Sequence, residues 1–108
     1  MAQQLKGTFT VTDTALTAVF MSEDGQTTYT YEAKDRPWPV VVDKIDAVLD
    51  VVEPDILQGF MTFRGRIGPA AIAIHMGGDG IDIQAQLKEA IEPPVSLRGS
   101  GNWSQSNS

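Results

Sequence analysis

Apolar and polar residues alternate along several short segments of the chain. From Leu5 to Thr12 every second residue is apolar or glycine, which is the period-two pattern of a strand with one buried face. The same pattern, rich in β-branched and aromatic residues, recurs in five later segments. The six predicted strands cover residues 5–12, 16–21, 27–33, 60–67, 70–76 and 81–87.

Turn signals separate these segments. Residues 22–25 (Ser-Glu-Asp-Gly) predict a tight turn with Gly25 at positive φ, and the Gly-rich run 77–80 predicts a second hairpin turn. Residues 36–39 (Arg-Pro-Trp-Pro) end the first three strands, because proline cannot donate a hydrogen bond to a sheet. The first three strands therefore form an antiparallel meander.

One segment between the two groups of strands has a different period. Asp43 stands at the position of an N-cap, and Pro54 ends the segment. The opposite side of the expected helix is acidic, with Asp46, Asp50 and Glu53. The apolar positions, spaced i, i+3, i+4 and i+7 as on one face of a helix, are Ile45, Val48, Leu49 and Val52.

The sequence thus predicts an α+β fold: an antiparallel meander of about three strands, one central amphipathic helix and a second set of about three antiparallel strands. Residues 1–98 form the single domain, and the Ser/Asn/Gly-rich residues 99–108 form a flexible, disordered tail. For residues 82–91 a helix is the competing interpretation. The layout hints at two similar halves, although their residues do not match well enough to define a repeat.

Composition narrows the function classes. The 108 residues include 14 acidic and 8 basic side chains, for a net charge of −6, and no cysteine. This charge disfavours nucleic-acid binding and suits a basic protein partner. With no apolar run near the length of a membrane span, and no signal peptide, we expect a soluble protein, cytoplasmic or assembled inside the cell into a particle.

No catalytic constellation is apparent. His75 is the only histidine, so no histidine pair can bind a metal. Residues 77–82 resemble one nonapeptide of the calcium-binding β-roll repeats, but Gln84 stands where those repeats have a large apolar residue, and a single turn cannot complete the oxygen shell. We therefore predict no metal, no cofactor and no enzymatic activity.

Four side chains are candidates for contacts with a partner. Arg64 and Arg66 share one face of a predicted strand and could hold a carboxylate or phosphate, the alternative being cross-strand pairing with acids. Trp38 is either a lid over the core or an exposed anchor. Trp103, alone in a polar tail, would dock on its own core, on a sister subunit or on a partner.

The function that this pattern favours is a small non-enzymatic interaction or assembly protein. It would self-associate as a homo-oligomer or bind a protein partner through sheet edges and the tail, as phage-type structural or accessory proteins do. The first alternative is an acidic inhibitor or immunity-like protein that binds a basic surface through Asp46, Asp50 and Glu53. The second is a small ligand-binding domain or enzyme around His75.

Overall fold

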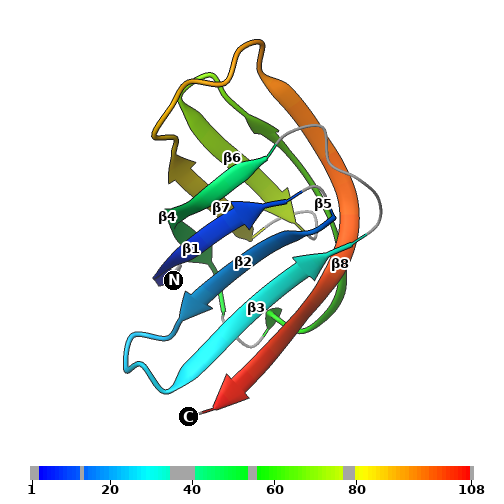
Figure 1. Ribbon diagram of the computed structural model, residues 1–108. Coiled ribbons are helices and arrows are strands. Elements are labelled where there is room, and N and C mark those ends of the chain that lie inside the picture. The colour runs from blue at the N-terminus through cyan, green and yellow to red at the C-terminus, as the bar shows by residue number, and fades with distance from the viewer. Residues whose placement is uncertain (1–2, 13, 35–40, 54–55, 77–79, 108) are drawn as a thin grey trace.

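The protein is a closed barrel of eight antiparallel strands, shown in Figure 1. This computed structural model describes residues 3–12, 14–34, 41–53, 56–76 and 80–107. None of these residues forms an α-helix, so none forms a helix long and apolar enough to cross a membrane. The strands are β1 (Gln3–Val11), β2 (Leu16–Met21), β3 (Thr27–Ala33), β4 (Val42–Val51), β5 (Gly59–Ile67), β6 (Ala71–Met76), β7 (Ile81–Gln86) and β8 (Val95–Asn107).

The barrel consists of two halves with the same connectivity. Around the barrel the strands follow the order β1-β2-β3-β8-β5-β6-β7-β4, and β4 pairs with β1. In the first half three consecutive strands are followed by β4, which returns to lie beside β1. In the second half β8 returns in the same way to lie beside β5. Each half is therefore a Greek key.

The interior is filled with apolar side chains. Inward positions of every strand contribute to one core, and no polar or charged residue is buried in the described part of the chain. Tyr31 is fully buried, but its hydroxyl donates a hydrogen bond of 2.8 Å to the backbone carbonyl of Met61. Among the described residues, the interior thus holds no Asp, Glu, Lys, Arg or His side chain.

Close approach between strands requires a glycine at the same place in each half. Gly7 in β1 and Gly65 in β5 lie on the first strand of their Greek keys, opposite β2 and β6. A Cβ at Gly7 would lie 1.8 Å from the Val19 carbonyl oxygen, and one at Gly65 would lie 2.4 Å from that of Ala73. The first hairpin of each half therefore packs too tightly for any side chain at these positions.

The predicted α+β class is wrong, because the expected helix is β4. Its buried positions alternate from Ile45 to Val51, but Asp43 and Lys44 are both exposed. These two residues lie opposite Thr10 alone, in a β-bulge that shifts the register between β1 and β4. The extra residue moves the alternation by one position. The helical spacing at residues 45–52 has another cause: Val48 and Val52 are apolar although they do not belong to the buried row, which contains Ile45 and Leu49.

The expected disordered tail is also wrong. Residues 99–107 are the second part of β8, which pairs with β5 on one side and β3 on the other. Figure 1 shows this long, curved strand between the two. Its polar composition is that of the outer face, while Leu97, Gly101 and Trp103 face inward. Backbone pairing on both sides, which composition does not reveal, orders the segment.

The six predicted strands are confirmed, with ends that differ by a few residues. Residues 81–86 form a strand and residues 87–91 contain no helix, so the helical alternative for 82–91 is wrong. The turn at residues 22–25 is confirmed as well, and Gly25 has a φ of 75°. The Gly-rich turn lies in part outside the described residues, which resume at Gly80.

Candidate partner-binding surface

The outward side chains of β5 and β8 form a ladder of four cross-strand rows. Because the two strands pair antiparallel in continuous register, each row brings one side chain of β5 directly opposite one of β8. The rows are Phe60 with Asn102, Thr62 with Ser100, Arg64 with Arg98, and Arg66 with Ser96. We call this surface the β5–β8 face.

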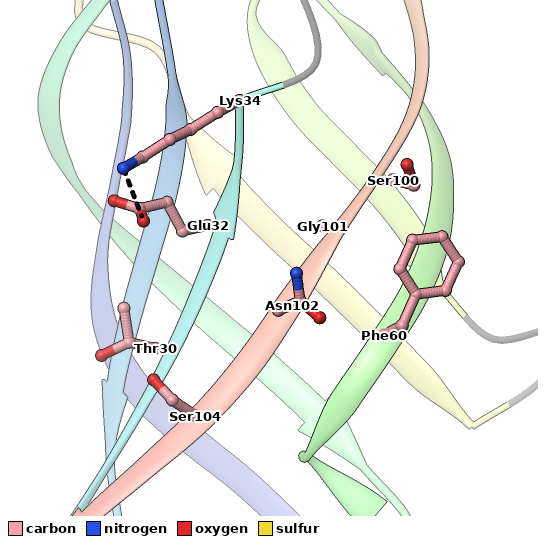
Figure 2. A pocket seen from close by; sticks show the side chains of 8 residues that line it. All are labelled: Thr30, Glu32, Lys34, Phe60, Ser100, Gly101, Asn102 and Ser104. Carbon is pink, nitrogen blue, oxygen red and sulfur yellow. Dashed lines mark ion pairs between the residues drawn. The ribbon is translucent and has the colours of Figure 1, made fainter.

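One end of the β5–β8 face presents an aromatic ring to solvent. Phe60 is 67% exposed, the highest value among the exposed large apolar side chains of the described residues. It borders a shallow depression of about 380 Å³, whose other wall carries the ion pair between Lys34 and Glu32, with Nζ and Oε1 3.3 Å apart. Figure 2 shows Asn102 between the two walls. The depression thus combines an apolar ring with amide and hydroxyl groups.

The other end of the face is basic. Arg64 lies opposite Arg98 on β8 and opposite His75 on β6, and Arg66 lies opposite Ser96 and Ala73. The cross-strand acids that would neutralise Arg64 and Arg66 are therefore not among their direct neighbours. Neither arginine forms an ion pair with a carboxylate in the part of the chain that the structure describes.

The charge of this face has the opposite sign to that of the whole chain. β5 and β8 carry three arginines and not one acidic residue. The chain has a net charge of −6, so subtracting the +3 of these two strands leaves −9 for the remainder. The β5–β8 face is therefore a localised positive surface on an acidic molecule.

The acidic candidate residues lie elsewhere on the barrel. Asp46 and Asp50 both point outward from β4, and Asp50 lies opposite Asp82 of β7. The Asp82 carboxylate contacts Nδ1 of His75, which is also exposed. Glu53 is exposed beyond the end of β4. The expected acidic helix face is thus a strand face, and Glu53 does not belong to it.

The two tryptophans do not contribute to a described surface. Trp103 is only 3% exposed, and its ring packs against those of Tyr31 and Phe20, with centroid distances of 5.2 and 6.5 Å. The sequence left three docking sites open for Trp103: its own core, a sister subunit or a partner. The structure shows that its ring docks in the protein's own core. Trp38 lies outside the described residues.

No group of side chains in the described ranges could hold a metal ion. His75 faces solvent on β6 between Arg64 and Asp82. Asp79, an acid of the Gly-rich run 77–80, lies outside the described residues. His75 therefore belongs to a charged row on the outside of the barrel.

Sequence reasoning missed Phe60, Asn102 and Arg98 as surface partners of the two predicted arginines. For Asn102 and Arg98 the missing information was the pairing of β8 with β5, whereas Phe60 shares one face of the predicted strand with the two arginines. The inward residues Leu97, Gly101 and Trp103 are separated by even numbers of residues, as on one face of a strand. This spacing could have indicated a strand through the polar segment.

No known protein family and no curated protein sequence matches this chain. Its structure is similar to that of the virulence-associated protein VapB from the intracellular pathogen Rhodococcus equi, with a TM-score of 0.61 and 16% sequence identity. The similarity covers 100% of both chains. The two proteins share a fold. At this identity the similarity concerns the arrangement of the strands alone.

Proposed function

We propose that this protein is a non-enzymatic interaction module that binds a partner protein through its β5–β8 face. The observation that carries the proposal is the positive, acid-free surface of β5 and β8 on a chain of net charge −6. Arginine and large aromatic side chains are the types enriched where protein interfaces concentrate their binding energy. The β5–β8 face provides both, with Phe60 about 13 Å along the strand from Arg64.

The packing of the barrel supports a role for the outer surface. The described interior contains no charged side chain, and its Tyr31 hydroxyl already donates a hydrogen bond to the Met61 carbonyl. The charged side chains named above and His75 lie on the outside of the barrel. Binding of a partner then requires no change in the core.

The partner we propose differs from the self-association expected first. That expectation relied on sheet edges and on Trp103 in a free tail. The closed barrel pairs each of the eight strands on both sides, and Trp103 lies in the core. The β5–β8 face is complementary to an acidic surface, and its short basic end fits a local cluster of acids better than a long polyanion.

Partner capture with matched variants tests the proposal. Wild-type protein, Phe60→Ser and Arg64→Glu would be used to capture partners from an extract of the source cells, and Kd would be measured with the identified partner. Lys44→Glu is the control. Lys44 is exposed on β4, so this substitution makes the same charge change as Arg64→Glu but away from the β5–β8 face. We expect the first two variants to weaken binding at least tenfold, as truncation of interface anchors does, and the control to bind normally.

The same experiment tests the alternative in which acidic residues of β4 bind a basic partner. If the double variant Asp46→Lys/Asp50→Lys abolishes binding while Phe60→Ser and Arg64→Glu have no effect, the partner is basic and the β4 surface binds it. Light scattering measures the mass of the purified protein in solution and so shows whether the partner is a second copy of the chain. A defined dimer that dissociates in Arg64→Glu would identify self-association through the β5–β8 face.

A further inference from the structure

His75 lies at the junction between the basic and the acidic parts of the outer surface. It is directly opposite Arg64 on β5 and directly opposite Asp82 on β7. The same row continues on β4, where Asp50 lies opposite Asp82. Because neighbouring strands lie about 4.8 Å apart, the charge of His75 acts on both sides of this junction.

The charged groups that face His75 come from the two strands beside it. Arg64 and Asp82 are its direct neighbours, and Arg66 lies diagonally across from it on β5. The corresponding diagonal neighbour on β7 is Gln84, which is neutral. Positive side chains therefore lie on one side of His75, and a negative side chain lies on the other.

The contact between His75 and Asp82 is open to solvent. The Asp82 carboxylate contacts Nδ1 of the His75 ring, and the two side chains are 54% and 40% exposed, His75 being the more exposed. The ring can therefore exchange a proton with water without any change in the barrel. A protonated ring forms an ion pair with the carboxylate, whereas a neutral ring does not compensate the charge of Asp82.

His75 is the residue of this row whose type can change charge near neutral pH. Histidine is the only side chain whose ordinary charge change falls between pH 5 and 8, and His75 is the only histidine of the chain. Aspartate and arginine side chains ordinarily keep their charges over this range. A pH-dependent charge beside Arg64 therefore has one source, which makes its effect simple to test.

We propose that protonation of His75 strengthens the binding of an acidic partner to the β5–β8 face, so the affinity increases as the pH falls from 8 to 5. This inference rests on the proposed function, because it assigns a regulator to the same face. The neutral ring leaves Arg64 near two acids, Asp82 and Asp50, whose negative potential opposes an approaching carboxylate. The protonated ring pairs with Asp82 and adds a positive charge beside Arg64.

The size of the effect follows from the exposure of the site. Charge pairs that face water change an equilibrium by about two- to fivefold, and we expect this change in affinity between pH 7.5 and pH 5.5. Coupling between two binding events is reciprocal. If a bound proton strengthens partner binding, partner binding must also take up protons at an intermediate pH.

The first test uses a blocked peptide of four glutamates as an acidic probe. The peptide would be titrated into ¹⁵N-labelled protein at pH 7.5 and pH 5.5 and at constant ionic strength, and the amide shifts of Arg64 and its neighbours would be followed. Glutamate ordinarily has a pKa of about 4.3, so the probe remains charged at both values. We expect binding about two- to fivefold tighter at pH 5.5. Equal affinities at the two pH values, or no binding at either, would overturn the proposal.

Two substitutions of His75 separate its charge from its shape. His75→Gln has no charge and should bind the peptide at both pH values as the wild type does at pH 7.5. His75→Lys is charged throughout and should bind at both as the wild type does at pH 5.5. Lys6→Gln, on the outer face of β1, is the control and should keep the pH dependence of the wild type. A pH dependence that persists in His75→Gln would assign it to another group.

Measurements with the captured partner separate this inference from the proposed function. If Arg64→Glu weakens binding but the wild type binds equally well at pH 7.5 and pH 5.5, the β5–β8 face is the interaction surface and regulation by His75 is refuted. If Arg64→Glu has no effect at either pH, the proposed function itself is refuted. The expected result is tighter binding at pH 5.5 in the wild type and not in His75→Gln. Calorimetry in buffers of different ionisation enthalpy should then show proton uptake on binding for the wild type, and less for His75→Gln.

Discussion

At the scale of single residues, the turn between β2 and β3 provides a measurable electrostatic effect. The Asp24 carboxylate accepts hydrogen bonds from the Ser22 hydroxyl and from the Gln26 backbone N–H. These bonds stabilise the charged form and hold the pKa of Asp24 below its ordinary value, with the Ser22 hydroxyl as the largest cause. The turn is therefore most stable when Asp24 is ionised.

We expect Ser22→Ala to raise the pKa of Asp24 toward its ordinary value. A carboxyl group with a lowered pKa in the folded state contributes stability above its unfolded pKa and loses it as the pH falls through the folded pKa. An NMR titration of the Asp24 carboxyl carbon measures this directly, and Ser106→Ala at the far end of β8 serves as the control. An unchanged pKa in Ser22→Ala would show that the hydroxyl does not stabilise the carboxylate.

Arg64 also illustrates a conflict between stability and binding. Replacing it with threonine removes the charge opposite Arg98 and introduces a residue that favours strands. We expect Arg64→Thr to raise the free energy of unfolding by about 0.2–1 kcal/mol, while the proposed partner binds the β5–β8 face more weakly. Urea denaturation measures the first effect, and Lys44→Thr, which relieves no such pair, is the comparison. A destabilised Arg64→Thr would indicate that the arginine has a structural partner.

At the scale of elements, β8 determines whether the sheet closes. It is the only strand of the described chain that joins β3 to β5. Without its second part, both neighbours would present unpaired edges, and Trp103 would leave the core. The polar composition of this strand conceals its structural importance.

We therefore expect a chain that ends at Arg98 to lose cooperative unfolding. The truncation removes residues 99–108 and with them all pairing between β8 and β3. Circular dichroism during a thermal scan would show a broad transition in place of a single one. A truncated protein that melts as cooperatively as the full chain would mean that these residues are dispensable for the barrel.

The tight hairpin at Gly7 gives a second expectation at this scale. Gly7→Ala places a methyl group where the Val19 carbonyl lies, so β1 and β2 have to separate. Overpacking of this kind costs about 1–3 kcal/mol or more. Gly25→Ala is the comparison, because its added Cβ meets no atom within 4 Å but stands at a positive φ. The free energies of unfolding of the two variants, measured by denaturation, therefore separate steric overlap from backbone strain. Equal stability of Gly7→Ala and the wild type would exclude the close approach.

The sequence predicted six strands because each has a regular alternation. It did not predict β4, because the apolar Val48 and Val52 outside its buried row complete a helical spacing. It did not predict β8, whose inward positions include Gly101. Arg64 and Arg66 could be recognised as neighbours on one face. Phe60 lies on the same predicted strand and could have been placed on that face as well. The relation of the arginines to Arg98 and Asn102 could not be predicted, since it arises from pairing between segments about 30 to 40 residues apart in the sequence.

At the scale of the whole molecule, charge is distributed unevenly around a uniform apolar interior. The acidic residues of β4 and β7 are separated by β6 from the arginines of β5 and β8. An acidic partner approaching the barrel is attracted to one side and repelled from the other. The barrel thus combines an interior without charged side chains with an uneven surface charge, which would orient the acidic partner proposed above before contact.

The place of β8 also affects the order in which the molecule can be completed during its synthesis. The ribosome makes β8 after the other seven strands of the barrel, yet β8 lies between β3 of the first half and β5 of the second. Until it emerges, the nascent chain can form two open sheets whose edges remain available to other chains. Closure of the barrel therefore cannot precede the synthesis of β8, which completes the fold and supplies one side of the β5–β8 face.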